Sequence, residues 1–350
     1  MFKNFFNTFT EDLGMDLGTI STQIYSPNQG LMMVEPSIVA VNQKTDRIVA
    51  VGKDAELMIG RTPSHINAIR PLENSVISNF EVAEEMLAYF LRKSLLSAGK
   101  KIFRTRLVVG VPSGITNVER RAIRDAVRNA GVREVYLVEE TMAAALGIGL
   151  PINDPVGNMI VDMGGGTTDI AVISLGGVVQ SKNINIAGLH FNNDIISYIR
   201  DEFKILIGEK TAEDIKTSIG TVIKPDEPVE FTVRGRDLVT GLPREVVITD
   251  SDIREAISGS VVQLLDSIKE VLEITPPEVV ADIMQRGIIL VGGGSLIIGL
   301  PELLTRELSI SVSLAEEPHL AVVKGTGIIL DDLPNYQEFL IDNEDELPPR

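Results

Sequence analysis

The sequence predicts an α/β protein made of two related lobes, and three observations support this fold class. A short motif of aspartate, glycine and threonine occurs once in each half, at Gly14–Thr19 and again at Val161–Asp169. Strand-like apolar runs alternate with amphipathic helical segments in both halves, which is typical of an α/β fold with substantial parallel sheet. Between the halves, Gly147–Gly157 is rich in glycine and proline and marks a boundary.

The elements of the first half follow from the spacing of apolar residues. In Phe80–Leu96, for example, Val82, Met86, Phe90 and Leu91 recur with helical spacing. The predicted segments are, in order, a β-rich stretch at Gly14–Tyr25, strands at Ile38–Val41 and Ile48–Val51, the helix Phe80–Leu96, a strand at Arg106–Val111, a helix at Val118–Ala130, a strand at Val135–Val138 and a helix at Glu139–Leu146.

The second half starts again with a strand, a glycine turn and a strand. Its predicted segments are strands at Asn158–Asp162, Ile170–Ser174 and Val178–Ile186, helices at Ile195–Ile207 and Ala212–Ile219, two strands of an antiparallel insertion at Glu230–Arg234 and Glu245–Ile248, a helix at Asp252–Leu272, a strand at Gly287–Val291 and a turn at Gly292–Gly294. An acidic tail covers residues 342–350.

Composition excludes several classes of protein. A net charge of −17 gives no basic footprint for a nucleic acid, so we expect no nucleic-acid partner. No apolar run approaches the ~20 residues that span a membrane. The chain has no cysteine, which excludes thiolate metal sites and fits a reducing compartment. The three histidines, His65, His190 and His319, stand apart in sequence, so we expect ordinary loop or surface residues rather than a zinc cluster.

The repeated motif suits phosphate binding. Glycine lets backbone N–H groups approach and surround a phosphate, and the turns at Gly18-Thr19 and Gly164–Thr168 offer this. Asp16 and Asp162 would repel the phosphate unless Mg²⁺ lay between, held through its water shell. The hydroxyls of Thr19 and Thr167 can bond phosphate oxygens or an attacking water. Two unrelated corners would give the same pattern, but its presence in both halves favours one shared cleft.

Two further features leave alternatives open. The turn within Leu290–Leu296 is either a plain strand-to-helix connection or a backbone surface for adenine or ribose. Glu140 begins a predicted helix, where the helix dipole favours a carboxylate, and it could instead orient or deprotonate the attacking water. Glu139 competes for that second role, and spacing does not choose between them.

The N-terminal residues 1–10 form an amphipathic tip. Phe2, Phe5, Phe6 and Phe9 fall on one face of a helix, which favours an interfacial membrane anchor over rings folded onto the body. Because a single tip would bind weakly, we expect membrane attachment to depend on many tips in one assembly.

These residues resemble a known family. Met15–Thr19 and Asp162–Thr168 resemble the two phosphate motifs of the actin/Hsp70/sugar-kinase superfamily, and the chain most resembles the MreB family of bacterial actins. The resemblance covers about residues 13–330, in the family's order. The other matching stretches are Glu35–Ser37, Ile59–Pro63, Ala68–Pro71, Val111–Gly114, Val118–Ala122, Met142–Ala145, Gly235–Leu238, Thr275–Glu278 and Leu290–Gly294.

The resemblance implies an actin-like ATPase fold, with ribonuclease H-like mixed sheets flanked by helices around a nucleotide cleft. It places lobe I at residues 11–150 with an insertion at about 37–80. Lobe II is placed at residues 151–335 with an insertion at about 188–250, and the chain returns to lobe I at about 325–341. It implies ATP and Mg²⁺ as cofactors, slow hydrolysis, and head-to-tail polymerisation into antiparallel double filaments.

The same resemblance implies a cytoplasmic protein, peripheral on the inner face of the cell membrane. Its partners would be further copies of itself, the membrane surface, cell-wall elongation proteins and a transmembrane adaptor, and its role would be to set rod cell shape. A hydrophobic loop at Ile102 and Phe103, flanked by basic residues, looks like a second membrane contact, although a buried pair at the start of a strand would read the same way.

Site residues carry over by motif. Asp16 and Asp162 would hold Mg²⁺ through water, and Glu140 and Thr167 would position the attacking water. The residues that would contact the nucleotide are Gly18, Thr19, Ile20, Ser21 and Thr22 in the first loop, Gly164, Gly165, Gly166 and Thr167 in the second, Glu213, Lys216 and Thr217 near the ribose and base, and Gly292, Gly293, Gly294 and Ser295 beneath the adenosine.

This chain departs from the family at several of these motifs. Ser21 and Thr141 stand where the family usually has asparagine and proline, and Leu189 and Asn192 stand where it has two aspartates. We therefore expect very slow hydrolysis. The alternatives to a filament-forming ATPase are an ATP-binding adaptor of a pilus or division machine without long filaments, and a small-molecule kinase, for which no general-base aspartate motif is visible. A chaperone of the Hsp70 class would need a further substrate-binding domain.

Overall fold

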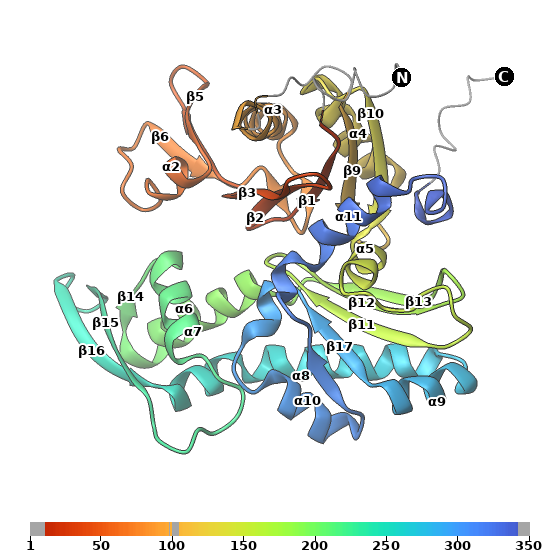
Figure 1. The fold of residues 1–350 in the computed structure, drawn as a ribbon. Coiled ribbons are helices and arrows are strands. Elements are labelled where there is room, and N and C mark those ends of the chain that lie inside the picture. Colours follow the sequence, from red (N-terminus) through yellow and green to blue (C-terminus); the bar gives the residue numbers. More distant parts are fainter. Residues whose placement is uncertain (1–10, 98, 100–104, 342–350) are drawn as a thin grey trace.

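The structure, a computed structural model, describes residues 11–97, 99 and 105–341. Two lobes lie one above the other in Figure 1, the first in red to yellow and the second mostly in green to blue. The predicted tip with Phe2, Phe5, Phe6 and Phe9, the pair Ile102 and Phe103, and the acidic tail lie outside the described residues. Within the described part, no helix is long and apolar enough to cross a membrane.

Each lobe is built on a five-stranded mixed sheet. The strands of the first are β1 (Leu13–Leu17), β2 (Ser21–Ser26), β3 (Gly30–Pro36), β9 (Arg106–Val111) and β10 (Glu134–Glu139). Those of the second are β11 (Asn158–Met163), β12 (Thr168–Ser174), β13 (Gly177–Ile184), β17 (Ile288–Val291) and β18 (Val312–Leu314). In both lobes the first strand lies in the middle, antiparallel to the next strand and parallel to a later one. This repeated topology confirms the predicted fold class.

Helices cover both sheets. They are α3 (Phe80–Ser97) and α4 (Asn117–Asn129) in the first lobe, and α8 (Asp250–Ile274), α9 (Pro277–Arg286) and α10 (Leu300–Leu308) in the second. Helix α4 begins at a reciprocal cap, in which Glu119 N donates to Thr116 Oγ1 at 3.2 Å and Thr116 N donates to Glu119 Oε2 at 2.7 Å. The predicted helices at 80–96, 118–130 and 252–272 are therefore confirmed, with ends shifted by at most two residues.

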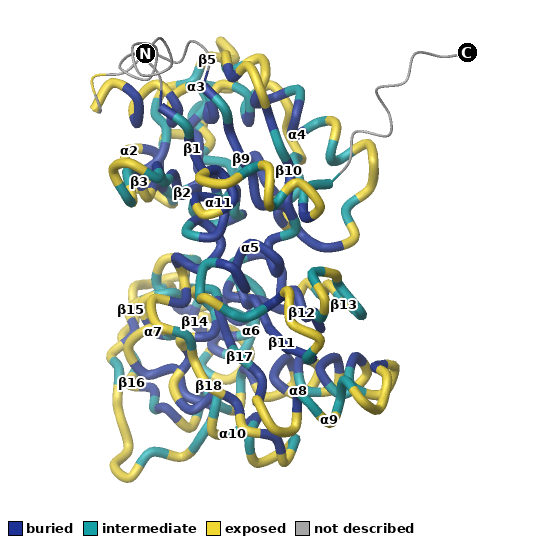
Figure 2. The backbone as a smooth tube through the Cα atoms, turned by 45° about the vertical axis from the view of Figure 1, so that its right-hand side comes forward, coloured by how far each residue is buried: buried dark blue, intermediate teal, exposed yellow. Residues whose placement is uncertain are grey.

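Two helices cross at the waist of the molecule, α5 (Glu140–Gly147) and α11 (Ala321–Asp331) (Figure 2). A Cβ at Gly325 would lie 1.7 Å from the carbonyl oxygen of Ala143, and one at Gly147 would lie 2.0 Å from that of Ala321. The crossing is thus close to two-fold symmetric and requires glycine on both helices. Helix α5 packs on β11 and β12 while α11 packs on β1, β9 and β2, so each helix contacts the sheet of the other lobe.

Each lobe also carries an insertion, and the two lie on the same side of the molecule (Figure 1). The first contains β4 (Val39–Asn42), β5 (Arg47–Val51), α2 (Lys53–Glu56) and β6 (Ile66–Ile69), followed by the hairpin β7 (Leu72–Glu73) and β8 (Val76–Ile77). The second contains α6 (Gly188–Phe203), β14 (Ile205–Leu206), α7 (Glu209–Ile219) and the antiparallel pair β15 (Glu230–Asp237) and β16 (Pro243–Thr249).

The predicted helix at Ile195–Ile207 is wrong at both ends. Helix α6 begins earlier, at Gly188, and ends at Phe203 because Lys204 has a positive φ of 57°. The next residues then pair as a strand, with Ile205 opposite Asp237. Apolar periodicity did not separate the end of the helix from this short buried strand.

Candidate functional site

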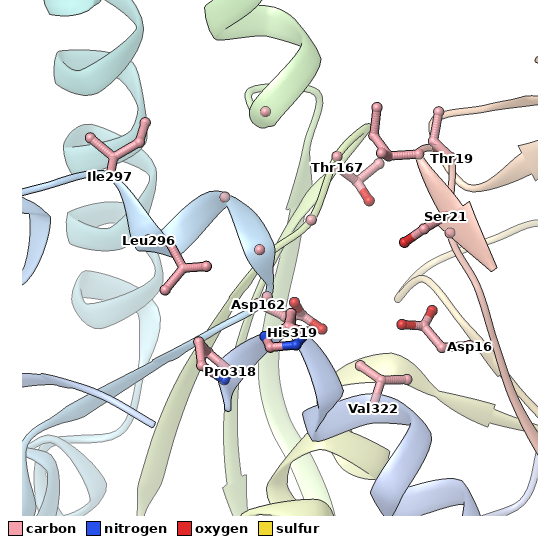
Figure 3. Close-up of a pocket in the computed structure, with 18 of the residues that line it drawn as sticks. Asp16, Thr19, Ser21, Asp162, Thr167, Leu296, Ile297, Pro318, His319 and Val322 are labelled. Atoms are coloured by element: carbon pink, nitrogen blue, oxygen red, sulfur yellow. The ribbon is translucent and has the colours of Figure 1, made fainter. Parts of the chain in front are cut away.

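A cavity of about 530 Å³ lies between the lobes (Figure 3). Both glycine turns, helix α7 and the third glycine turn line it. The predicted site residues that line the cavity are Asp16, Gly18, Thr19, Ile20, Ser21, Glu140, Asp162, Gly164, Gly165, Thr167, Glu213, Lys216, Thr217, Gly292, Gly293 and Gly294. The fold therefore brings together segments that are far apart in the sequence.

The two glycine turns meet at one end of the cavity. A Cβ at Gly165 would lie 2.0 Å from Ile20 Cγ1, and one at Gly166 would lie 2.4 Å from Thr19 Oγ1. The two turns therefore fit together only because these positions have no side chain. Figure 3 places Thr19 and Thr167 next to each other at this junction.

Ser75, in the turn between β7 and β8, joins this junction. Its backbone N–H donates to Thr19 Oγ1 at 2.7 Å, and its hydroxyl lies 3.4 Å from Thr167 Oγ1. Both turn residues, Asn74 and Ser75, have positive φ, as a type I′ hairpin turn requires. The hairpin of the first insertion thus contacts both glycine turns, and the sequence motifs did not indicate it.

Three predicted residues are not part of the cavity lining: Thr22, Gly166 and Ser295. The Thr22 hydroxyl is buried against Ser37 Oγ at 2.9 Å, and Ser37 in turn donates to the carbonyl oxygen of Gly18 at 2.7 Å. Ser295 donates to the carbonyl oxygen of Gly292 at 2.6 Å. Their hydroxyls hold the first and third turns in shape from behind.

Three carboxylates converge on the cavity, of which Asp162 and Glu140 are buried and Asp16 is partly buried. Asp16 and Asp162 occupy matching positions on the central strands β1 and β11, and Glu140 begins α5. Burial raises the pKa of Asp16 to about 7. Burial also raises the pKa values of Asp162 and Glu140, and the neighbouring negative charges add to the rise in both. Glu140 Oε1 is buried without a hydrogen-bond partner.

This carboxylate set fits a hydrated Mg²⁺. Among the described residues, no three His, Asp or Glu side chains are close enough to ligate a metal together. Mg²⁺ keeps several waters and uses few carboxylates, so second-sphere contacts from Asp16 and Asp162 suit it. A cation there would also offset the negative charge of the carboxylates, and its water shell would supply a hydrogen-bond partner for the unpaired Glu140 oxygen.

The structure distinguishes Glu140 from Glu139. Glu140 lines the cavity, whereas Glu139 Oε2 accepts a hydrogen bond from Ser113 Oγ at 3.0 Å and does not line it. Of the two, only Glu140 is placed to meet a water in the cavity.

The far end of the cavity is mostly apolar. Besides Gly292–Gly294, it is lined by Leu296, Ile297, Ile298, Pro318 and His319. Gly292 has a φ of 81°, and a Cβ there would lie 2.4 Å from Asp162 Oδ1, so the third turn packs against the second. The third turn is therefore part of the cleft and not only a connection between strand and helix.

Several lining residues were missed from the sequence. His319 was expected to be an ordinary loop or surface residue; it is exposed, but it also lines the cavity. Its carbonyl oxygen accepts from Gln23 Nε2 at 2.8 Å. Leu296–Ile298 directly follow the third glycine turn, a signal that could have extended the predicted site. No local pattern marks Gln23, Ser75 or Pro318.

Two mixed sheets of one topology, crossing helices and two facing glycine turns define an actin-like protein with a cleft suited to a nucleotide. The family model described as MreB/Mbl protein matches residues 10–338, so the chain belongs to the MreB/Mbl family. It is 46% identical over 325 residues to the cell shape-determining protein Mbl of Bacillus subtilis (strain 168), covering 93% of this chain and 97% of that protein. It is 45% identical over 335 residues to the cell shape-determining protein MreB of Escherichia coli (strain K12), covering 95% and 96%.

Solved structures agree. MreB5 of Spiroplasma citri bound to ADP has a TM-score of 0.88 and 37% identity, covering 94% of this chain and 98% of that one. The same protein bound to AMPPNP gives 0.89 and 36%, with the same coverage. The MamK double helical filament, at 0.79 and 23% identity, covers 93% and 100% and supports the fold alone. The predicted family is confirmed, and the chain is an actin-like cytoskeletal protein of the MreB/Mbl family.

Proposed function

We propose that this protein binds ATP with Mg²⁺ in its cleft and polymerises into antiparallel double filaments on the inner face of the cell membrane. There the filaments organise cell-wall synthesis and so set rod cell shape. The observation that carries the proposal is the junction of the two glycine turns beside Asp16 and Asp162. The related MreB5 structures contain ADP and AMPPNP, which supports a nucleotide in this cleft.

The residues divide the work by position. Backbone N–H groups of Gly18–Ser21 and Gly165–Thr167 surround the phosphates, while the Gly164 N–H closes the second turn on the carbonyl oxygen of Thr167 at 2.9 Å. Asp16 and Asp162 hold the water shell of Mg²⁺. The metal supplies positive charge that offsets the phosphates and the buried carboxylates. Glu140 and Thr167 orient the attacking water, while Glu213 and Lys216 on α7 meet the ribose and base. Thr217 shapes the wall of the cavity, because its hydroxyl donates to the carbonyl oxygen of Glu213 at 2.9 Å.

Each filament subunit consists of the two lobes, residues 11–150 and 151–335. The chain's return to lobe I at 325–341 joins them, and a hydrogen bond from Ile341 N to the carbonyl oxygen of Leu137 at 2.9 Å supports this return. Attachment to the membrane uses the tip with Phe2, Phe5, Phe6 and Phe9 and the loop at Ile102 and Phe103. Cell-wall elongation proteins and a transmembrane adaptor complete the assembly.

Electron microscopy with ATP, Mg²⁺ and liposomes tests the proposal. We expect paired filaments on the lipid surface, and no filaments from Asp162→Ala, which removes one of the two central-strand carboxylates. ATP binding without any filament would contradict polymerisation and favour the adaptor function. Deleting residues 2–9 should reduce liposome co-sedimentation and leave ATP binding intact; unchanged sedimentation would rule out the anchor.

Hydrolysis is tested separately. We expect slow phosphate release, because Thr141, Leu189 and Asn192 replace residues that are usual in the family's motifs. Turnover well above that of typical MreB proteins would contradict this expectation.

A further inference from the structure

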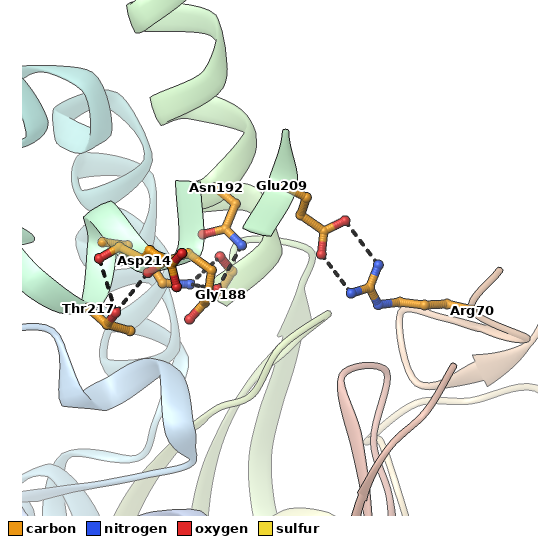
Figure 4. Close-up of polar contacts among 8 residues, drawn as sticks. Arg70, Gly188, Asn192, Glu209, Asp214 and Thr217 are labelled. Atoms are coloured by element: carbon orange, nitrogen blue, oxygen red, sulfur yellow. Dashed lines mark hydrogen bonds and ion pairs between the residues drawn. The ribbon is translucent and has the colours of Figure 1, made fainter. Parts of the chain in front are cut away.

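Asn192 is a buried amide beside the cavity that the repeated motifs do not explain. It lies on α6, is 1% exposed, and its Nδ2 donates to Glu213 Oε2 at 2.7 Å (Figure 4). The opposite orientation of the amide would place its oxygen against the carboxylate, so this contact fixes which way Asn192 points. Asn192 therefore meets Glu213 as a donor, which an aspartate at this position could not do when ionised.

Lys216 donates to the same carboxylate oxygen. Its Nζ lies 2.7 Å from Glu213 Oε2 and 2.9 Å from the carbonyl oxygen of Gly188, the first residue of α6. Glu213 Oε2 thus accepts from two donors on two helices, α6 and α7. The Lys216 side chain is 10% exposed, so this anchor is largely shielded from water.

The rest of the Glu213 side chain is open to solvent and to the cavity. Its side chain is 46% exposed and it lines the cavity. Because Oε2 is occupied twice, Oε1 is the oxygen left for a ligand. An ionised carboxylate is an acceptor only, so what it recognises is a donor: a sugar hydroxyl or an amino group, and not a phosphate.

We propose that Asn192 is a positioning residue that fixes Glu213 for the ribose hydroxyls of the bound nucleotide. Asn192 thereby sets how strongly the protein prefers a ribonucleotide to a nucleotide without those hydroxyls. The proposal rests on the proposed nucleotide function of the cleft. Without Asn192, Glu213 keeps only Lys216 as a fixed partner, and the cost of ordering its side chain moves to the binding step.

The test measures equilibrium affinity for ATP and for 2′,3′-dideoxy-ATP, with Mg²⁺, in the full-length protein. Hydrogen bonds to a charged acceptor predict that the wild type binds ATP roughly 10- to 100-fold more tightly than the dideoxy nucleotide. Asn192→Ala should weaken ATP binding by roughly three- to tenfold, the cost of ordering one long side chain, and leave dideoxy-ATP binding unchanged. Asn192→Asp, which keeps the size and removes the donor, should lower the same ratio.

Two controls separate this role from a structural one. Asn158→Ala removes another buried asparagine, 3% exposed, that lies outside the cleft and donates to the carbonyl oxygen of Val156 at 3.1 Å. It should leave the ATP to dideoxy-ATP ratio at the wild-type value. ITP lacks the amino donor of adenine, so an Asn192→Ala effect that appears for ATP but not for ITP would assign Glu213 to the base and overturn the ribose proposal.

The remaining outcomes are distinct. If Asn192→Ala leaves the ratio of ATP affinity to dideoxy-ATP affinity unchanged, whether or not both affinities fall, the positioning role is wrong. If the wild type binds neither nucleotide, the proposed function itself fails.

Discussion

Replacing Asp16 by asparagine should stabilise the nucleotide-free protein at pH 8 while removing tight binding of Mg²⁺ and ATP. Asp16 lies on β1 at the cavity, and burial raises its pKa from 3.8 to about 7. At pH 8 the folded protein must therefore keep this group ionised against the cost of burial. Asparagine has nearly the same shape and carries no charge, so the cost disappears.

The size of the effect follows from the pKa change. A rise from 3.8 to about 7, at about 1.36 kcal/mol per pKa unit, corresponds to up to about 4 kcal/mol in the free energy of unfolding. Because the charge on Asp16 also raises the pKa values of Glu140 and Asp162, its removal eases the burial of both neighbours. Functional carboxylates of this kind reduce stability in return for binding.

The direction of the Asp16 pKa shift determines how the stability difference depends on pH. A carboxyl whose folded pKa is raised contributes full stability below its unfolded pKa and loses it as pH rises through the folded value. The advantage of Asp16→Asn should therefore be small near pH 4 and grow up to about pH 7 to 8. Urea denaturation in EDTA at a series of pH values measures this, and a nucleotide-binding assay measures the accompanying loss.

Asp237→Asn is a control with the opposite sign. Hydrogen bonds from the Thr240 backbone and Arg244 lower the pKa of Asp237 to about 2, so this substitution should destabilise the protein at pH 8. If Asp16→Asn is no more stable than the wild type at pH 8, or if its advantage does not shrink toward pH 4, the reasoning about the buried carboxylates is wrong.

Two further predictions concern how the lobes are joined. The Arg70 guanidinium bonds both oxygens of Glu209 across the two insertions, at 3.0 and 2.6 Å, with side chains 21% and 34% exposed (Figure 4). Arg70→Ala should therefore speed nucleotide release only about two- to fivefold in stopped-flow measurements, because partly exposed ion pairs contribute about 1 kcal/mol or less. If the effects of Arg70→Ala and Glu209→Ala on the release rate are strictly additive in the double variant, the pair is not coupled. Gly325→Ala should lower the free energy of unfolding by about 1–3 kcal/mol or more, because the added Cβ meets the backbone of Ala143. As a control, Gly259→Ala adds a Cβ in open space on α8 and should raise the free energy of unfolding by about 0.5–1 kcal/mol. Equal melting temperatures for the two glycine variants would contradict the close crossing.

The elements that carry a local pattern could be predicted from the sequence. Both glycine turns follow a buried strand directly, so Asp16 and Asp162 could be placed at matching strand ends from the pattern of residues alone. Long helices such as α3 and α8 keep helical spacing over four or more turns, and their ends differ from the prediction by only one or two residues.

The missed parts depend on contacts between distant segments. Ser75 meets Thr19 and Thr167 only because the first insertion folds back over the cleft, and two short strands give a weak pattern. His319 reaches the cavity because η2 (Pro318–Leu320) precedes the crossing helix α11. Gln23 pairs with Asp16 across two strands, and nothing in its own neighbourhood marks it. Sequence spacing does not report such tertiary contacts.

The repeat explains which part of the site could be predicted. Gln23 and Asp169 occupy equivalent positions, each paired with the central aspartate of its own sheet. Each also reaches the other half of the chain: Gln23 Nε2 donates to the carbonyl oxygen of His319 at 2.8 Å, and Ser113 N donates to Asp169 Oδ1 at 2.9 Å. The end of the cleft that we propose holds the phosphates is therefore built from repeated, reciprocal parts.

The other end has no counterpart among the described residues of the first lobe. Helices α6 and α7 belong to the second insertion, and the first insertion carries no helix pair in their place between residues 37 and 80. Because Asn192, Glu213 and Lys216 lie on these two helices, the features proposed to recognise the nucleoside occur on one side only. Under the proposed function, a nearly symmetric phosphate site combined with a one-sided nucleoside site leaves one orientation for a bound nucleotide, with its sugar toward α7. We therefore expect the unrepeated insertion, more than the repeated motif, to determine which nucleotide this cleft prefers.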